Sequence, residues 1–216
     1  MKKIKIYTPN LPQRTERKKS ITEQFEGKDL FDVNIVCPIP DKVASNSLWR
    51  TFFGVVEKER ENSSDFFIFC EDDHVFTDEY TDAFLLDRIK EADGMEADIL
   101  SGGVSWMRDA LQVRDHLFWM ERFNGMQFTV IYKRFYDKIL ATQYDETQKY
   151  VTDVFLSTLS DSIFVMFPYI SVQKEFGYSD VTTKNNKEGY VESLFEKTEK
   201  TLTILNKVRN HYGKLQ

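Results

Sequence analysis

The sequence has few of the residues and runs that mark several classes of protein. Only two of its 216 residues are cysteine, Cys37 and Cys70. Both lie in apolar, strand-like surroundings, so we predict two buried reduced thiols rather than a disulfide framework. No apolar run approaches the length of a membrane-spanning helix, and the first residues lack the apolar stretch of a secretory signal. We therefore expect a cytoplasmic protein.

Glycine and proline are scarce as well, with nine and five residues. No stretch rich in either divides the chain, so we predict one domain over residues 1–187 with a helical extension over 188–216. The net charge of −6 argues against a dedicated nucleic-acid binder. Aromatic residues, in contrast, are plentiful, and 18 Phe, 10 Tyr and 3 Trp can fill a sizeable core.

Apolar runs and helical spacing alternate along the chain. We predict strands at 3–8, 32–37, 66–70, 97–103, 126–132 and 163–167, and helices around 21–25, 48–59, 78–92, 133–141 and 152–159. This order is typical of βαβ units, so the expected fold is α/β with a mostly parallel sheet flanked by helices. Residues 104–124 lack clean periodicity and are expected to form a flexible or binding segment. An amphipathic helix is expected from 188 onward.

The most informative stretch is residues 65–76, where an apolar run leads directly into three acids, Glu71, Asp72 and Asp73, followed by His74. Such a run predicts a fully buried strand, and in open α/β sheets ligands bind beyond the carboxyl ends of the strands. Adjacent buried carboxylates repel one another and need a compensating positive charge. Mg²⁺ or Mn²⁺ meets that need and suggests a phosphate-bearing substrate.

Strand alternation places Glu71 and Asp73 on one face and Asp72 on the other. Asp73 is therefore the strongest metal-ligand candidate, with Glu71 or Asp72 assisting. The competing interpretation is a solvated turn whose acids cap the following helix. His74 is expected to be a surface or hydrogen-bonded residue rather than a ligand.

A second motif precedes the acidic cluster. The turn after the first strand reads Asn10-Leu11-Pro12-Gln13-Arg14-Thr15-Glu16-Arg17. Together with the Glu-Asp-Asp triplet behind a hydrophobic strand, it resembles glycosyltransferase family 25, enzymes of lipopolysaccharide biosynthesis, or a related family of the same GT-A class. The segments around Gly125, Thr152-Asp153 and Ser179-Asp180 are also similar to that group. The resemblance touches points along residues 4–180.

The resemblance implies a GT-A-like fold and a sugar transfer assisted by Mn²⁺ or Mg²⁺. The donor would be a nucleotide-diphosphate sugar, namely a UDP-sugar, and the acceptor a glycan or lipid-linked molecule of surface polysaccharide or lipopolysaccharide synthesis. The candidate residues divide by role: metal ligands Asp73 and Glu71; donor contacts Asn10, Arg14, Arg17, Asp72, Gln127, Ser179 and Asp180; general base Asp153; acceptor platform Trp106 and Trp119.

Several of these residues also have plainer interpretations. Arg14 and Arg17 suit a solvated first helical turn, Asp153 suits a helix N-cap, and Trp119 suits core packing. The final helix is basic and amphipathic, which allows peripheral contact with an anionic membrane, for example the inner membrane face. Packing on its own domain or on a second subunit is the alternative.

Two other functions remain open at the level of sequence. Nucleotidyl transfer uses the same metal and diphosphate chemistry, but the turn after the first strand lacks a Gly-rich phosphate loop. A non-catalytic sugar-binding or nucleotide-binding protein of the same fold is the second alternative.

Overall fold

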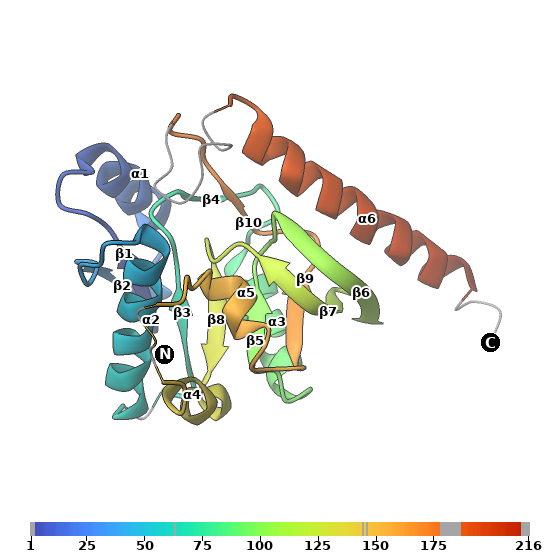
Figure 1. Ribbon diagram of the computed structural model, residues 1–216. Helices are drawn as coiled ribbons and strands as arrows, with labels where there is room; N and C mark the ends of the chain where they lie inside the picture. The colour runs from blue at the N-terminus through green and yellow to red at the C-terminus, as the bar shows by residue number, and fades with distance from the viewer. Residues whose placement is uncertain (1–2, 63, 144, 146, 178–186, 213–216) are drawn as a thin grey trace.

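The computed structural model describes residues 3–62, 64–143, 145, 147–177 and 187–212. Within them, eight strands form one sheet in the order β2-β1-β3-β8-β5-β9-β7-β6, and β10 and β4 form a two-stranded sheet (Figure 1). The strands are β1 (Ile4–Pro9), β2 (Phe31–Val36), β3 (Phe66–Phe69), β4 (His74–Phe76), β5 (Ile99–Ser101), β6 (Trp106–Arg114), β7 (Leu117–Asn124), β8 (Thr129–Tyr132), β9 (Ile163–Met166) and β10 (Ser171–Gln173).

Most strands of the large sheet run in one direction. β1 is parallel to β2 and β3, and β5 is parallel to β9. β8 is antiparallel to both β3 and β5, and β7 is antiparallel to both β9 and β6. In the described sheet, β8 and β7 are thus reversed relative to the other six strands. The expected α/β fold with a mostly parallel sheet is confirmed.

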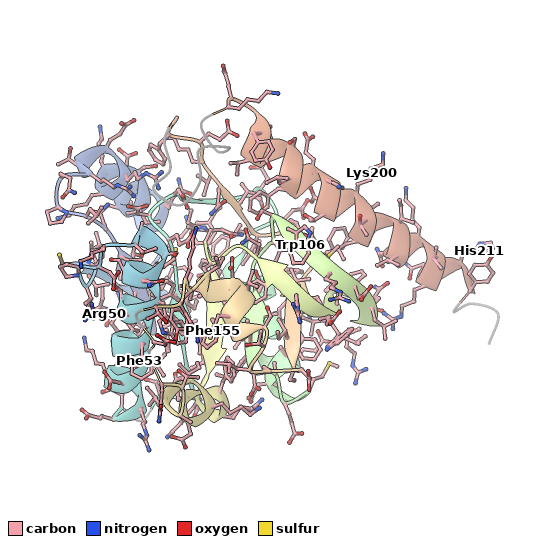
Figure 2. All side chains as sticks on the ribbon, viewed as in Figure 1. Arg50, Phe53, Trp106, Phe155, Lys200 and His211 are labelled. Carbon is pink, nitrogen blue, oxygen red and sulfur yellow. The ribbon has the colours of Figure 1, made fainter. Side chains whose placement is uncertain are left out.

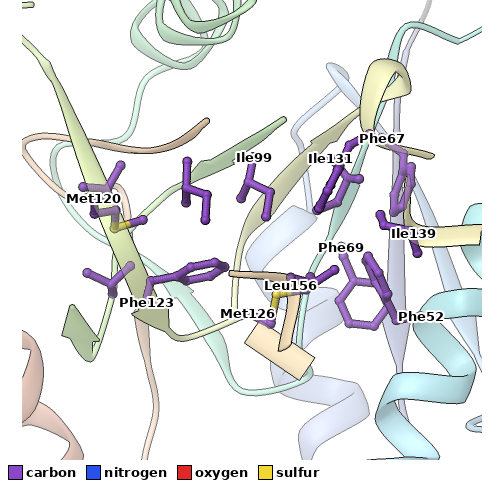
Figure 3. Packing of buried hydrophobic residues seen from close by; sticks show 14 of the residues in the cluster. Phe52, Phe67, Phe69, Ile99, Met120, Phe123, Met126, Ile131, Ile139 and Leu156 are labelled. Atoms are coloured by element: carbon purple, nitrogen blue, oxygen red, sulfur yellow. The ribbon is translucent and has the colours of Figure 1, made fainter. Parts of the chain in front are cut away.

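Successive strand residues point to opposite sides of the sheet, so each face presents apolar side chains to be covered. Helices cover both faces. The helices are α1 (Thr15–Phe25), α2 (Ala44–Arg60), α3 (Asp82–Asp93), α4 (Lys133–Leu140), α5 (Thr152–Leu156) and α6 (Tyr190–Tyr212). In β3, Phe67 and Phe69 enter a core cluster with residues of α2, α4, α5 and α6, whereas Ile68 enters a second cluster with residues of α1 and α3. Figure 3 shows Phe67 and Phe69 packed near Phe52 of α2.

The C-terminal helix α6 shares the main core with the sheet. Val191, Phe195 and Leu202 follow helical spacing and are buried in the first cluster. The hydroxyl of Thr198 on the same face donates to the backbone oxygen of Val104 at 2.6 Å. The expected amphipathic helix is therefore confirmed, and Figure 1 shows it running beside β6.

The structure corrects several local predictions. Residues 104–124 form an antiparallel hairpin of β6 and β7 rather than a flexible segment. The helix expected from residue 78 begins at Asp82, because the Thr81 hydroxyl accepts a hydrogen bond from the Phe84 N–H and caps it. Both cysteines are free, as expected, but Cys37 is exposed, and Cys70 alone is buried.

None of the helices in the described part of the chain has both the length and the apolar character that crossing a bilayer requires.

Candidate functional site

A cavity of about 650 Å³ lies at the carboxyl ends of β1 and β3. These strands are adjacent and parallel, with Tyr7 opposite Phe69, and the Cys70 N–H donates to the Tyr7 carbonyl at 3.0 Å. Both strands therefore deliver their following loops to the same edge of the sheet. The rest of the wall comes from the loop after β2 with the start of α2, the end of β7 with the residues after it, the start of α5, the segment after β10 and the start of α6.

Arg17, in the first turn of α1, connects that helix to the acidic turn after β3. One guanidinium nitrogen, Nη1, lies 2.9 Å from Asp72 Oδ1 and 3.1 Å from Asp73 Oδ2. Asp72 Oδ2 accepts a second hydrogen bond, at 2.8 Å, from the Asn10 side-chain amide. Both oxygens of Asp72 are thus engaged, so Asp72 holds Asn10 and Arg17 in place.

Asp73 retains an oxygen for a further partner. Its Oδ1 is buried and makes no hydrogen bond within the described residues, while Oδ2 faces Arg17. Burial raises the pKa of Asp73 to about 6, although the neighbouring Arg17 guanidinium opposes that rise. A buried carboxylate oxygen without a donor is costly, and a cation or a ligand donor would offset that cost.

Glu71 lies next to the same group of acids. Burial, followed by the charges of Asp73, Asp153 and Asp72, raises its pKa well above the ordinary value. Its Oε2 accepts one hydrogen bond, at 3.1 Å, from the Gln173 side chain. Its neighbours Asp72 and Asp73 and the distant Asp153 therefore all act electrostatically on Glu71.

Asp153 occupies the first turn of α5 on another side of the cavity. Its Oδ2 accepts a hydrogen bond from the Gly125 N–H at 2.6 Å, and Oδ1 accepts one from the Val154 N–H at 2.8 Å. Burial raises the pKa of Asp153. The N-cap position is Val151, without a side-chain cap bond, so the N-cap interpretation of Asp153 is not supported.

The acids supply oxygen atoms of the kind that divalent cations prefer as ligands. Among the described residues, no three Asp, Glu, His or Cys side chains converge as a complete metal cage. Mg²⁺, however, is usually held by one or two carboxylates, with substrate phosphates and waters completing its shell. The unpartnered Oδ1 of Asp73, close to Glu71, matches that pattern.

Residues 173–176, at the end of β10 and directly after it, connect this acid group to the rest of the molecule. Gln173 donates to Glu71, and the Lys174 N–H donates to the Asp73 carbonyl at 2.7 Å. Glu175 accepts hydrogen bonds from the N–H groups of Gly189 and Val191 at the start of α6, at 2.7 and 2.6 Å. The ring of Phe176 lies 4.7 Å from the Arg17 guanidinium carbon.

The structure brings most of the predicted site residues together. Arg14, Arg17, Glu71, Asp72, Asp73 and Asp153 all line the cavity. Asn10 contacts it through Asp72. Ser179 and Asp180 lie outside the described residues. His74 is fully buried, with Nδ1 2.7 Å from the Ser171 hydroxyl, and burial lowers its pKa to about 3. It is hydrogen-bonded, one of the two alternatives predicted, but it lies in the core rather than at the surface.

Three residues that were predicted to contact donor or acceptor are not among the described residues that line the cavity. Gln127 is fully buried, and its amide nitrogen donates to the Gly103 carbonyl at 2.6 Å. Trp119 donates from Nε1 to the Asp161 carbonyl at 2.7 Å. Trp106 is 46% exposed near the start of β6 (Figure 2). These side chains do not meet the acids in this conformation.

Gln173, Lys174 and Phe176 were not predicted as site residues. They reach the cavity because β10 pairs with β4, which follows the acids directly. Both strands have only three residues, too few to show a period in the sequence. The spacing of Gln173 from Glu71, 102 positions, leaves no local signal either.

The described residues thus define an α/β protein with an acid-lined and arginine-lined cavity at the carboxyl edge of its sheet. No protein-family model and no curated protein sequence matches the chain. Solved structures share a partial likeness of the backbone. A UDP-glucose pyrophosphorylase complexed with UDP-glucose is 10% identical, with a TM-score of 0.46 over 92% of this chain and 100% of that one.

Two further structures show a similar degree of likeness. A glycosyltransferase involved in glycosylation of the major capsid of PBCV-1 is 10% identical, with a TM-score of 0.42 over 77% of this chain and 94% of that one. HddC from Yersinia pseudotuberculosis is 9% identical, with a TM-score of 0.43 over 78% and 72%.

Proposed function

We propose that this protein is a GT-A-type glycosyltransferase that moves a sugar from a nucleotide-diphosphate donor, a UDP-sugar, to a glycan or lipid-linked acceptor. One observation carries the proposal: the arginines at the start of α1, the acids after β3 and Asp153 line the same cavity. Cations for a diphosphate, carboxylates for a metal and a separate buried carboxylate are the groups that such a transfer uses.

The donor diphosphate would bind on the side of the first loop. Arg14 and Arg17 line this part of the cavity, and Arg17 is fixed by Asp72 and Asp73. A guanidinium held in one orientation contacts phosphate oxygens with little further loss of side-chain entropy. In this proposal Asp72 acts on the donor indirectly, because its two oxygens hold Asn10 and Arg17.

A divalent cation would be held by Asp73 and Glu71. The Oδ1 atom of Asp73 has no hydrogen-bond partner in the described residues, and Glu71 lies among like charges that a cation would neutralise. When bound, Mn²⁺ or Mg²⁺ supplies positive charge for the diphosphate leaving group. Arg17 would add to that charge from the other side of Asp73.

Asp153 is the proposed general base. The Gly125 and Val154 amides fix its carboxylate, and burial raises its pKa. A carboxylate with a raised pKa accepts a proton from an acceptor hydroxyl more readily than an ordinary one. Val191 and Leu194 of α6 line the cavity as well and give the acceptor an apolar contact.

The proposal can be tested by measuring UDP release from a panel of UDP-sugars with Mn²⁺ and candidate surface-glycan acceptors. Wild type should turn over one member of the panel, and Asp73→Asn should lose that turnover. The exposed Asp87→Asn on α3 removes the same charge elsewhere and should retain it. Full activity of Asp73→Asn would refute the metal role. UDP binding without any turnover would favour a non-catalytic nucleotide-binding protein.

A further inference from the structure

The outward face of α6 combines cations with exposed apolar side chains. The inner face, defined by Val191, Phe195, Thr198 and Leu202, is buried against the sheet and hairpin. On the opposite side, at spacings of three and four residues, stand Lys197, Lys200, Ile204, Lys207, Val208 and His211. We call these six residues the outer face of α6. Figure 2 shows Lys200 and His211 projecting away from the sheet.

The six residues of the outer face include no acid, although the whole chain has a net charge of −6. The exposed Glu196 lies beside them, one turn before Lys200. The glutamates of α6, which are Glu192, Glu196 and Glu199, all lie in the first half of the helix, and residues 200–212 contain none. All six side chains of the outer face are exposed. A locally cationic surface on an acidic protein is a feature that a simple solvated helix does not require.

The helix dipole accounts for only part of this charge distribution. Cations are stabilised near a helix C-terminus, but the effect fades within the last turn. His211 lies in that turn, whereas Lys197 and Lys200 lie near the middle of the helix. The dipole also gives no reason for Ile204 and Val208 to be 52% and 48% exposed among these cations.

We propose that the outer face of α6 docks on an anionic lipid membrane. A helix with a basic polar surface and embedded apolar side chains binds at the boundary between headgroups and acyl chains. Lys200 and Lys207 would face anionic headgroups, and Ile204 and Val208 would enter the boundary. Because α6 also supplies Val191 and Leu194 to the cavity, docking would place the cavity near lipid-linked molecules.

A second copy of the chain is a poorer occupant of this face. A two-fold symmetric contact sets the same surface against itself. Lys200 and Lys207 would then meet the lysines of the other copy, with only the flanking Glu196 of each copy near enough to compensate them. The charge of the face is complementary to anionic headgroups instead.

Vesicle flotation tests the docking directly. Wild type should bind phosphatidylcholine vesicles that contain phosphatidylglycerol and should not bind pure phosphatidylcholine vesicles. Binding should weaken with added salt, because the attraction is screened. Lys200→Gln with Lys207→Gln should lower the partition coefficient by about 25-fold, from ~5-fold for each cation at an anionic surface.

The control is Lys90→Gln with Lys133→Gln, which removes the same charge from exposed positions on α3 and α4. It should bind like wild type. Ile204→Ser with Val208→Ser should weaken binding without lowering the melting midpoint, because both side chains are exposed. Absent binding to anionic vesicles, or equal binding by the Lys200/Lys207 variant, would overturn the proposal. So would a concentration-dependent dimer, seen by sedimentation velocity, that the Ile204/Val208 variant abolishes.

Discussion

Arg17 and Asp72 form a buried ion pair that joins the helix after β1 to the turn after β3. Nη1 and Oδ1 are 2.9 Å apart, and the two side chains are only 7% and 8% exposed. The same nitrogen also contacts Asp73. The two loops that carry the proposed donor site are therefore positioned by one another.

Removing Arg17 should destabilise the fold strongly. Arg17→Met leaves Asp72 and Asp73 without their shared cation, and breaking a buried pair in this way costs about 3–5 kcal/mol. Urea unfolding would measure the loss. Arg17→Met combined with Asp72→Asn should cost less than the sum of the two single changes, because the pair is already broken. Strictly additive costs would show that the two side chains do not interact energetically.

Gly125 should be costly to replace, because of its backbone conformation and a close side-chain neighbour. Its φ is +125°, and an added Cβ would lie 2.6 Å from Gln127 Oε1. Gly125→Ala should therefore lower stability by about 2–3 kcal/mol and disturb the amide that binds Asp153. Thermal unfolding together with UDP release would detect both effects.

Gly27 offers a matched control for that experiment. Its φ is +74°, but no atom lies within 4 Å of an added Cβ. Gly27→Ala should cost only the backbone strain of a left-handed residue, about 1 kcal/mol. Equal losses at the two glycines would contradict the steric explanation for Gly125.

Stabilisation by UDP should depend on a divalent metal. A ligand at 100 times its dissociation constant stabilises the native state by about 2.7 kcal/mol, which raises the melting midpoint. We expect UDP to produce such a shift with Mn²⁺ and to lose most of it after chelation with EDTA. Asp73→Asn should abolish the difference between the two conditions. An unchanged UDP shift in EDTA would argue against a metal between the acids and the diphosphate.

Asp153→Asn should separate chemistry from binding. The amide keeps the size of the side chain but cannot act as a base, so kcat should fall by about 10²–10⁴-fold. Donor affinity, measured by calorimetry, should change little, because Asp153 lies across the cavity from the arginines in the proposed arrangement. A fall in donor affinity that equals the fall in kcat would assign Asp153 to binding instead.

Trp119 should affect stability rather than acceptor recognition. Trp119→Phe removes the Nε1–H donor and leaves the Asp161 carbonyl without that bond, at a cost of about 1 kcal/mol. The acceptor KM should stay the same, because Trp119 is not among the described residues that line the cavity. A raised KM with unchanged unfolding would restore Trp119 as an acceptor contact.

The sequence was informative where the pattern is local. The apolar run of β3 and the acids that follow it predicted a buried strand that ends at the edge of the sheet where ligands bind. Asp72 and Asp73 do line the cavity at that edge. It was uninformative for β6, an edge strand that is partly exposed on both sides, so its apolar residues do not alternate cleanly.

The contacts around the acids were also beyond prediction. Gln173 meets Glu71, and Asp153 meets Gly125, only because the fold brings together segments that are far apart in the sequence. Strand alternation predicted that Glu71 and Asp73 lie on one face and Asp72 on the other, yet all three acids line one cavity. They follow the end of β3 rather than continuing it, so the two-residue period no longer applies.

The short run from Gln173 to Phe176 has a mechanical consequence. Gln173 and Lys174 hold the acid loop, Glu175 holds the first turn of α6, and Phe176 lies against Arg17. Adjacent residues of one segment therefore fix both the first turn of α6 and the loop that carries Asp73.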